Sequence, residues 1–150
     1  MRYLILLLFF SIQLRAQVLV PSERAKVHIT SNTEELQKLL FAGPQFQQPI
    51  VYIDYSPLYP SIVGLTRKIG NGYYIIDLNP IATYDKLEWV LMHELVHVWQ
   101  LHIGILSSDA KHFYYRGKTY PIQFPYSLRP WEKEAEAITG EICNPTLYTK

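Results

Sequence analysis

The sequence contains one cysteine, Cys143, among its 150 residues. A single thiol can form neither an internal disulfide nor a zinc site built from several cysteines, so His and carboxylate side chains remain as ligands for any metal. An excess of charge is also lacking, because 14 Lys and Arg nearly cancel 13 Asp and Glu and neither sign forms a run. This balance argues against nucleic acid as a partner.

Long hydrophobic runs are scarce too. The run from Tyr3 to Ile12 is shorter than the roughly 20 residues that a helix needs to cross a bilayer. Its length, with Arg2 before it, is typical of a secretory signal. We therefore expect residues 1–16 to be a signal peptide cleaved after Ala16, and the protein to be secreted or to lie in the periplasm or cell envelope. If the segment is not cleaved, it would instead anchor the protein to a membrane.

The remaining residues, 17–150, are expected to form a single domain. The chain is 49% hydrophobic, 14% aromatic and 18% charged, which is typical of a folded globular protein. It contains no internal repeat, low-complexity tract or linker-like segment.

Short strand patterns dominate the first half of this domain. Gly70, Asn71 and Gly72 separate two of them and favour a hairpin. The predicted elements are strands over Lys26–Thr30, Pro49–Tyr55, Ser61–Arg67 and Gly72–Leu78, and a helix over Thr33–Phe41.

The most informative feature is the pattern H-E-x-x-H at residues 93–97. Four residues on a helix return to nearly the same face, so His93 and His97 can bind one cation, with Glu94 beside it. A helix is predicted from Tyr84 to Ile103, ending at Gly104.

This helix carries a narrow polar stripe between two apolar flanks. Lys86, His93, His97 and Gln100 fall within an arc of about 60°, which should open into a cleft, whereas His102 points to the opposite side. Two imidazoles in an otherwise apolar environment need hydrogen-bonding partners or a shared ligand, which favours a metal site.

A catalytic zinc site needs a third protein ligand, with water as the fourth. A second helix is predicted from Pro130, and it contains Glu132, Glu134 and Glu136. An H-E-x-x-H helix followed after about 35 residues by E-x-x-A-E resembles the gluzincin branch of zinc metallopeptidases, in the zincin superfamily.

The resemblance implies a role for each matching residue. His93, His97 and Glu132 would be zinc ligands, Glu94 the general base, and Glu136 a second-shell residue that hydrogen-bonds a ligand histidine. Glu132 and Glu136 share a helix face, whereas Glu134 points elsewhere. If Glu132 is not the ligand, Glu136 would be the substitute.

The predicted elements and this resemblance imply an α+β, zincin-like fold. A small mixed or antiparallel sheet would pack on the H-E-x-x-H helix and on a C-terminal helix that carries Glu132. A peptide or protein substrate would lie extended along an exposed strand edge, for which Gly72–Leu78 is the predicted strand.

Peptide hydrolysis also needs a group that stabilises the developing oxyanion. Fewer than ten residues of the sequence follow the second helix, so we expect no counterpart of the C-terminal lobe that supplies this group in larger gluzincins. A hairpin around Gly117 and the segment after it offer four alternatives: His112, Tyr120, Tyr126 and Arg129.

Two functions follow from these features. The first is an exported zinc peptidase that hydrolyses peptide bonds with a water activated by Glu94. The alternative is a zinc-binding envelope module with the same fold but without catalytic activity. The intact Glu94 favours the enzyme, because metal binding alone does not require it.

Overall fold

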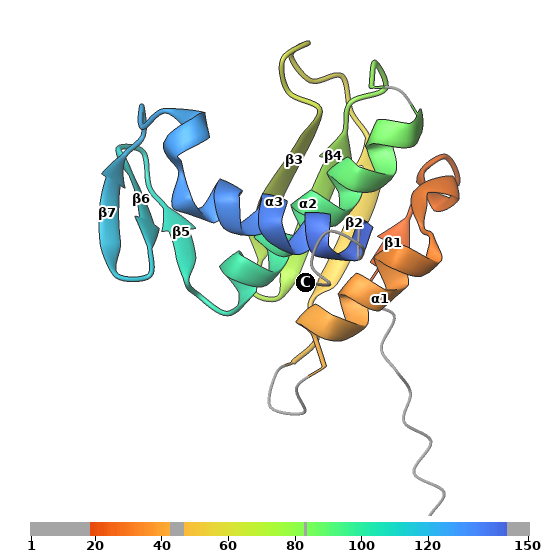
Figure 1. Cartoon of the computed structure of the whole chain (residues 1–150), viewed down its shortest axis with the longest axis horizontal. Helices are drawn as coiled ribbons and strands as arrows, with labels where there is room; N and C mark the ends of the chain where they lie inside the picture. The colour runs from red at the N-terminus through yellow and green to blue at the C-terminus, as the bar shows by residue number, and fades with distance from the viewer. Residues whose placement is uncertain (1–18, 43–46, 83, 144–150) are drawn as a thin grey trace, which may run out of the picture.

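The computed structural model describes residues 19–42, 47–82 and 84–143. Its fold is α+β, as predicted: a four-stranded mixed sheet packs against helices, and a three-stranded antiparallel sheet lies at one end of the molecule (Figure 1). The proposed signal peptide, residues 1–16, lies outside the described residues. Within the described part, no helix is both long and apolar enough to span a bilayer.

The four-stranded sheet has the order β1 (Leu19–Pro21), β2 (Ile50–Tyr55), β4 (Tyr73–Leu78) and β3 (Gly64–Gly70). β1 is parallel to β2 and β2 is parallel to β4, whereas β3 and β4 form the predicted antiparallel hairpin. Alternate side chains of β2 and β4 are buried against the helices: Val51, Ile53, Tyr74, Ile76 and Leu78.

The prediction of β4 as the exposed edge strand is wrong. β4 lies between β2 and β3, so β3 forms the edge. The inner face of β4 is apolar and almost fully buried, whereas β3 carries Thr66 and Lys68 at the equivalent positions. The more apolar strand of the hairpin therefore takes the central position, where both of its edges are paired.

The three α-helices are α1 (Ser31–Leu40), α2 (Tyr84–His102) and α3 (Pro130–Cys143). Each agrees with a helix predicted from the sequence. Thr30 caps α1 by accepting a hydrogen bond from the Thr33 backbone. After α2, Gly104 has a φ of 77°, the left-handed conformation expected of a glycine that ends a helix.

The predicted strand over Lys26–Thr30 is wrong. Residues Ala25–His28 form a short 3-10 helix, η1, in which the backbone N–H groups of Ala25 and Lys26 both donate to the carbonyl of Ser22. The position beside β2 is taken by β1, a strand that was not predicted. The alternating pattern of Lys26–Thr30 therefore has no strand beside it with which to pair.

The three-stranded sheet consists of β5 (Leu106–Ser108), β6 (His112–Tyr115) and β7 (Lys118–Pro121). β6 and β7 form the predicted hairpin, and Arg116 and Gly117 at its turn have φ of 47° and 78°. Its apolar side chains pack with Trp131 at the start of α3. The 3-10 helix η2 (Tyr126–Leu128) then leads into α3.

Gly64 allows β3 to lie close to α2. A Cβ atom at this position would be 2.5 Å from Val90 Cγ1 and 2.9 Å from Glu94 Cγ, closer than real Cβ contacts. Any side chain there would push the edge strand away from the helix that carries the H-E-x-x-H motif.

We predict that Gly64→Ala lowers the free energy of unfolding by about 1–3 kcal/mol, because Val90 is buried and stiff at χ1 and cannot move aside freely. Urea unfolding followed by circular dichroism measures this change. Gly70→Ala in the same strand is the control, since its nearest neighbour would be at 3.6 Å. Equal stability of the two variants would contradict the close contact.

Candidate metal centre

The two motif histidines lie on adjoining turns of α2, in its most deeply buried part. Every residue from Leu91 to Val98 is buried. The apolar members of this stretch pack into the core, which leaves His93 and His97 facing the same side of the helix. Their ring centroids are 4.7 Å apart and the rings are nearly perpendicular.

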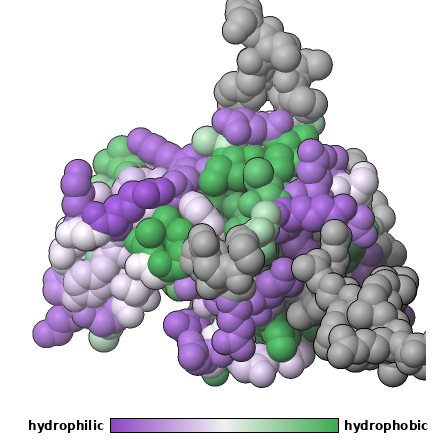
Figure 2. Space-filling view, turned by 90° about the horizontal axis from the view of Figure 1, so that it is seen from below, coloured by the Kyte–Doolittle hydropathy of each residue, from purple (hydrophilic) through white to green (hydrophobic). Residues whose placement is uncertain are grey.

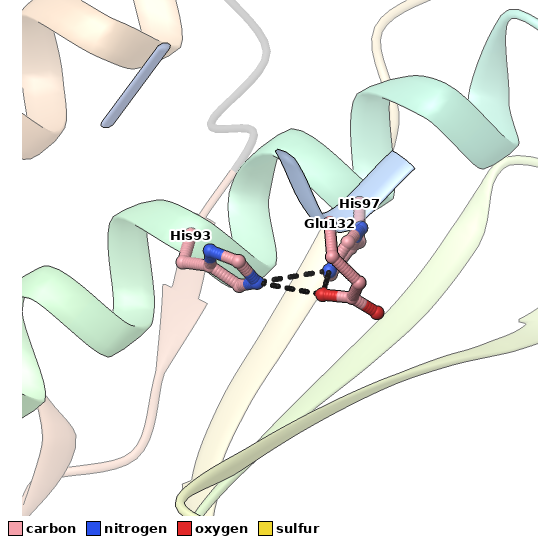
Figure 3. A group of neighbouring side chains, drawn as sticks. All are labelled: His93, His97 and Glu132. Carbon is pink, nitrogen blue, oxygen red and sulfur yellow. Dashed lines mark hydrogen bonds and ion pairs between the residues drawn. The ribbon is translucent and has the colours of Figure 1, made fainter. Parts of the chain in front are cut away.

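Helix α3 brings Glu132 to these rings. Its Oε2 atom lies 3.1 Å from Nε2 of His93 and 3.0 Å from Nε2 of His97, and the two Nε2 atoms are 3.1 Å apart. Figure 3 shows the three side chains, two from α2 and one from α3, pointing toward one another. They are buried, and within the described residues they form the group that could hold a metal ion.

The separations of these atoms fit a tetrahedral ion. Ligand atoms about 2.0–2.1 Å from a tetrahedral zinc lie roughly 3.3 Å from one another. The observed triangle, with sides of 3.0–3.1 Å, is slightly tighter than this value. Two imidazoles and one carboxylate suit zinc and other transition metals better than Mg²⁺ or Ca²⁺, which prefer six or more oxygens.

A hydrogen-bond network fixes the tautomer of His97. Nε2 of Gln100 donates to the carbonyl of Trp131 at 3.0 Å and to the carboxylate of Glu134 at 2.8 Å. Both groups are acceptors only, so Oε1 of Gln100 must face His97, 2.8 Å from Nδ1. His97 therefore carries its proton on Nδ1 when neutral, and its Nε2 lone pair is directed at the proposed site.

His93 is held differently. Its ring stacks on Trp89, with centroids 5.1 Å apart and planes 25° apart. Its buried Nδ1 atom has no hydrogen-bond partner within the described residues. Stacking on Trp89, rather than a hydrogen bond at Nδ1, therefore supports this imidazole, whose Nε2 atom faces Glu132.

The three groups favour a positive charge between them. Burial acts to raise the pKa of Glu132, but hydrogen bonds from His93 and His97 outweigh it and hold the pKa well below its usual value. Burial likewise acts to lower the pKa of His97, but the hydrogen bond to Glu132 and the charges of Glu94 and Glu132 raise it overall. When no metal ion is bound, a proton supplies the positive charge at this place. A bound metal ion would supply that charge instead.

Glu94 lies beside this group but is held by a different element. Its carboxylate is buried, and Oε2 accepts a hydrogen bond of 2.7 Å from the hydroxyl of Thr66 on β3. The same hydroxyl lies 3.1 Å from the Glu94 carbonyl oxygen. β3 thus fixes the position of the carboxylate that the sequence analysis assigned as general base.

A cavity of about 460 Å³ opens next to the three converging groups. Its wall combines the edge of the four-stranded sheet with β5, β6 and the start of α3, and most of its lining is apolar. The lining includes His93, Glu94, His97, Glu132, Ser61–Thr66, Trp89, Val90, Leu101, Leu106–Ser108, Phe113, Tyr126, Arg129 and Trp131.

Two of the four predicted oxyanion stabilisers reach this cavity. Tyr126 and Arg129 line it. Partial burial, the charge of Glu132 and a hydrogen bond to that carboxylate raise the pKa of the Tyr126 phenol, so it remains a neutral donor. Tyr120 instead packs on Trp131, and His112 lies on the exposed hairpin beside Asp109.

The structure does not bring Glu136 to the ligand histidines. Its side chain is exposed, and no hydrogen bond joins it to His93 or His97 in the described structure. Gln100 supports His97 instead, and Glu134, which the sequence analysis set aside, supports Gln100. The buried side chains of α3 are Trp131, Glu132, Ala135 and Thr139, so Glu136 lies outside the buried face of the helix.

Sequence reasoning missed the roles of Thr66, Gln100 and Glu134. For Gln100 a signal was present, because it lies on the polar stripe of α2, three residues after His97. Thr66 and Glu134 gave no such signal, since their contacts join elements that are distant in the sequence.

No protein-family model, curated protein or solved structure gives a significant match to this chain.

We predict that Glu132→Gln lowers the affinity for Zn²⁺ by about 100-fold or more, because a neutral amide is a weaker ligand than a carboxylate between two imidazoles. Competition with a chromogenic chelator measures the affinity. Glu136→Gln, one turn further along α3, should bind Zn²⁺ like the wild type. The reverse result would make Glu136 the ligand.

The Gln100 network predicts a smaller effect. Gln100→Met should weaken Zn²⁺ binding by about 10- to 100-fold, since it removes the acceptor that orients His97 while keeping a similar volume. The same competition assay measures it. Unchanged affinity in a folded variant would show that packing alone orients the ring.

Proposed function

We propose that this protein is an exported zinc-dependent peptidase, in which His93, His97 and Glu132 hold the metal and Glu94 is the general base. The observation that carries the proposal is the position of a second buried carboxylate, Glu94, in the wall of the cavity where the three ligands converge. The resemblance of the motifs to the gluzincins supports the same assignment.

The donor set fits a catalytic site better than a structural one. Structural zinc sites are closed by four protein ligands, whereas catalytic sites use three and leave one position open. Here three side chains converge at the edge of a cavity. A zinc ion bound there would activate water and polarise a substrate carbonyl.

Glu94 would accept and return the proton. Thr66 holds Oε2 of the carboxylate, which leaves Oε1 available to accept a proton as water attacks the peptide carbonyl. The carboxylic acid formed in this way can then donate the proton to the leaving amine. The phenol of Tyr126 is a neutral donor within the same cavity and is the preferred candidate for stabilising the oxyanion.

An extended substrate would pair with β3 rather than with β4. β3 is an edge of the four-stranded sheet. Residues 61–63 lead into it and residues 64–66 form its beginning, and all of them line the cavity. Main-chain hydrogen bonds along this edge would hold the substrate backbone next to the metal ligands.

The experiment that tests the proposal compares the wild type with Glu94→Gln. The variant should bind Zn²⁺ normally but cleave a peptide library at least 100-fold more slowly, because the amide cannot accept the proton. Metal analysis and mass spectrometry of the digest are run on the same samples.

The matched control is Glu141→Gln, which changes an exposed carboxylate on α3. It should leave both zinc content and cleavage unchanged. Full activity of Glu94→Gln would contradict the role of Glu94, and zinc binding by a wild type that cleaves no peptide would support the non-catalytic module instead.

A further inference from the structure

Arg129 contributes to the cavity wall a positive charge that no carboxylate among the described residues neutralises. It lies just before α3 and lines the same cavity as the metal-binding group. Within the residues that the structure describes, no carboxylate forms an ion pair with it, whereas Arg67 and Arg116 each pair with an acidic side chain.

The guanidinium of Arg129 is held rigidly by aromatic rings. Its Cζ atom lies 4.9 Å from the ring centroid of Phe113, 5.6 Å from that of Tyr126 and 5.8 Å from that of Trp131. Its Nε atom donates to the carbonyl of Phe124 at 3.0 Å. Contacts from several sides fix the orientation of the group before any ligand binds, which lowers the entropy lost on binding.

Packing on rings does not satisfy the hydrogen-bonding capacity of this group. A guanidinium has five N–H donors, and the Nε–H is the one that has an acceptor among the described residues. The four N–H groups on Nη1 and Nη2 form the planar fork that binds a carboxylate through two parallel hydrogen bonds.

The charges in the cavity also favour an anion at this place. Glu94 and Glu132 are already engaged, by Thr66 and by the two histidines. If zinc binds as proposed, its two positive charges balance these two carboxylates, and Arg129 remains the unmatched charge in a mostly apolar cavity. Such a charge is best neutralised by a ligand that brings a carboxylate.

We propose that Arg129 binds a carboxylate of the substrate, and that the protein prefers peptides in which a carboxylate lies next to an apolar residue. The apolar side chain would contact the hydrophobic part of the lining. The carboxylate is either the C-terminus of the peptide or an Asp or Glu side chain. This inference deepens the proposed function and rests on it, because the bound peptide is a substrate only if the protein is a peptidase. Its test does not need catalysis.

The lining of the cavity fits a ligand that is apolar in one part and charged in another. Phe113 on β6 and Leu106 on β5 contribute apolar side chains to the same wall as Arg129. Figure 2 shows one face of the molecule, on which hydrophobic side chains gather near the middle with hydrophilic side chains around them.

Equilibrium binding to the zinc-loaded full chain carrying Glu94→Gln tests the proposal, because this background does not consume the probes. The first pair of probes is N-acetyl-phenylalanine and its amide. The second pair is the amides of N-acetyl-aspartyl-phenylalanine and N-acetyl-asparaginyl-phenylalanine. Isothermal titration gives each dissociation constant.

At least one pair should show a preference for the carboxylate of about 10-fold or more, the value of a charged hydrogen-bonded pair. A preference in the first pair identifies a C-terminal carboxylate, and one in the second pair a side-chain carboxylate. Arg129→Met should abolish the preference, and Arg129→Lys should reduce it severalfold, because Lys keeps the charge but lacks the fork.

Lys133→Met, an exposed cation one turn along α3, is the matched control and should keep the full preference. Zinc content and thermal unfolding of each variant confirm an intact site. If Arg129→Met does not fold, Arg129→Lys decides the question by the same severalfold loss. No carboxylate preference in either pair, or a preference that survives the changes at Arg129, overturns the proposal.

The outcome is separable from that of the proposed function. Carboxylate binding through Arg129 without cleavage by the wild type would retain the ligand site and reject the peptidase. Cleavage by the wild type without an Arg129-dependent preference would retain the peptidase and reject the ligand site.

Discussion

The meeting of one carboxylate with two imidazoles in a buried position constrains much of this structure. Oε2 of Glu132 lies within 3.1 Å of both Nε2 atoms, in a place where an unpaired charge would be strongly destabilising. Helices α2 and α3 must therefore pack closely at this level. Ala135 allows the close approach, and the buried ring of Trp131 fixes the first turn of α3 beside the three-stranded sheet.

The three-stranded sheet therefore contributes directly to the candidate metal site and its cavity. Arg116, at the turn of its β6–β7 hairpin, donates at 2.6 Å to Glu134, which accepts from Gln100, the acceptor for His97. A chain of hydrogen bonds thus links the hairpin to a proposed metal ligand. β5 and β6 also supply cavity wall, and Phe113 supports the guanidinium of Arg129.

Local patterns in the sequence predicted the parts of the fold that depend on local interactions. The α+β class, the three helices and both hairpins follow from periodicity, capping residues and glycines. The position of β4 did not, because strand order depends on which neighbour pairs with it across the chain. The convergence of His93, His97 and Glu132 was predicted from spacing and family resemblance. The exposed position of Glu136 was not, because it depends on which face of α3 is buried in the fold, and that face contains Trp131, Glu132, Ala135 and Thr139.

The two buried carboxylates near the proposed metal differ in their partners, and this difference bears on function. Glu132 faces two imidazoles and forms with them a group that could hold a metal ion. Glu94 faces a hydroxyl of β3, and the strand can approach it because residue 64 is glycine. A site that only binds metal needs the first carboxylate, but it gains nothing from burying a second one at the cavity wall. The close fit of an edge strand against Glu94 therefore favours a site in which that carboxylate takes part in chemistry.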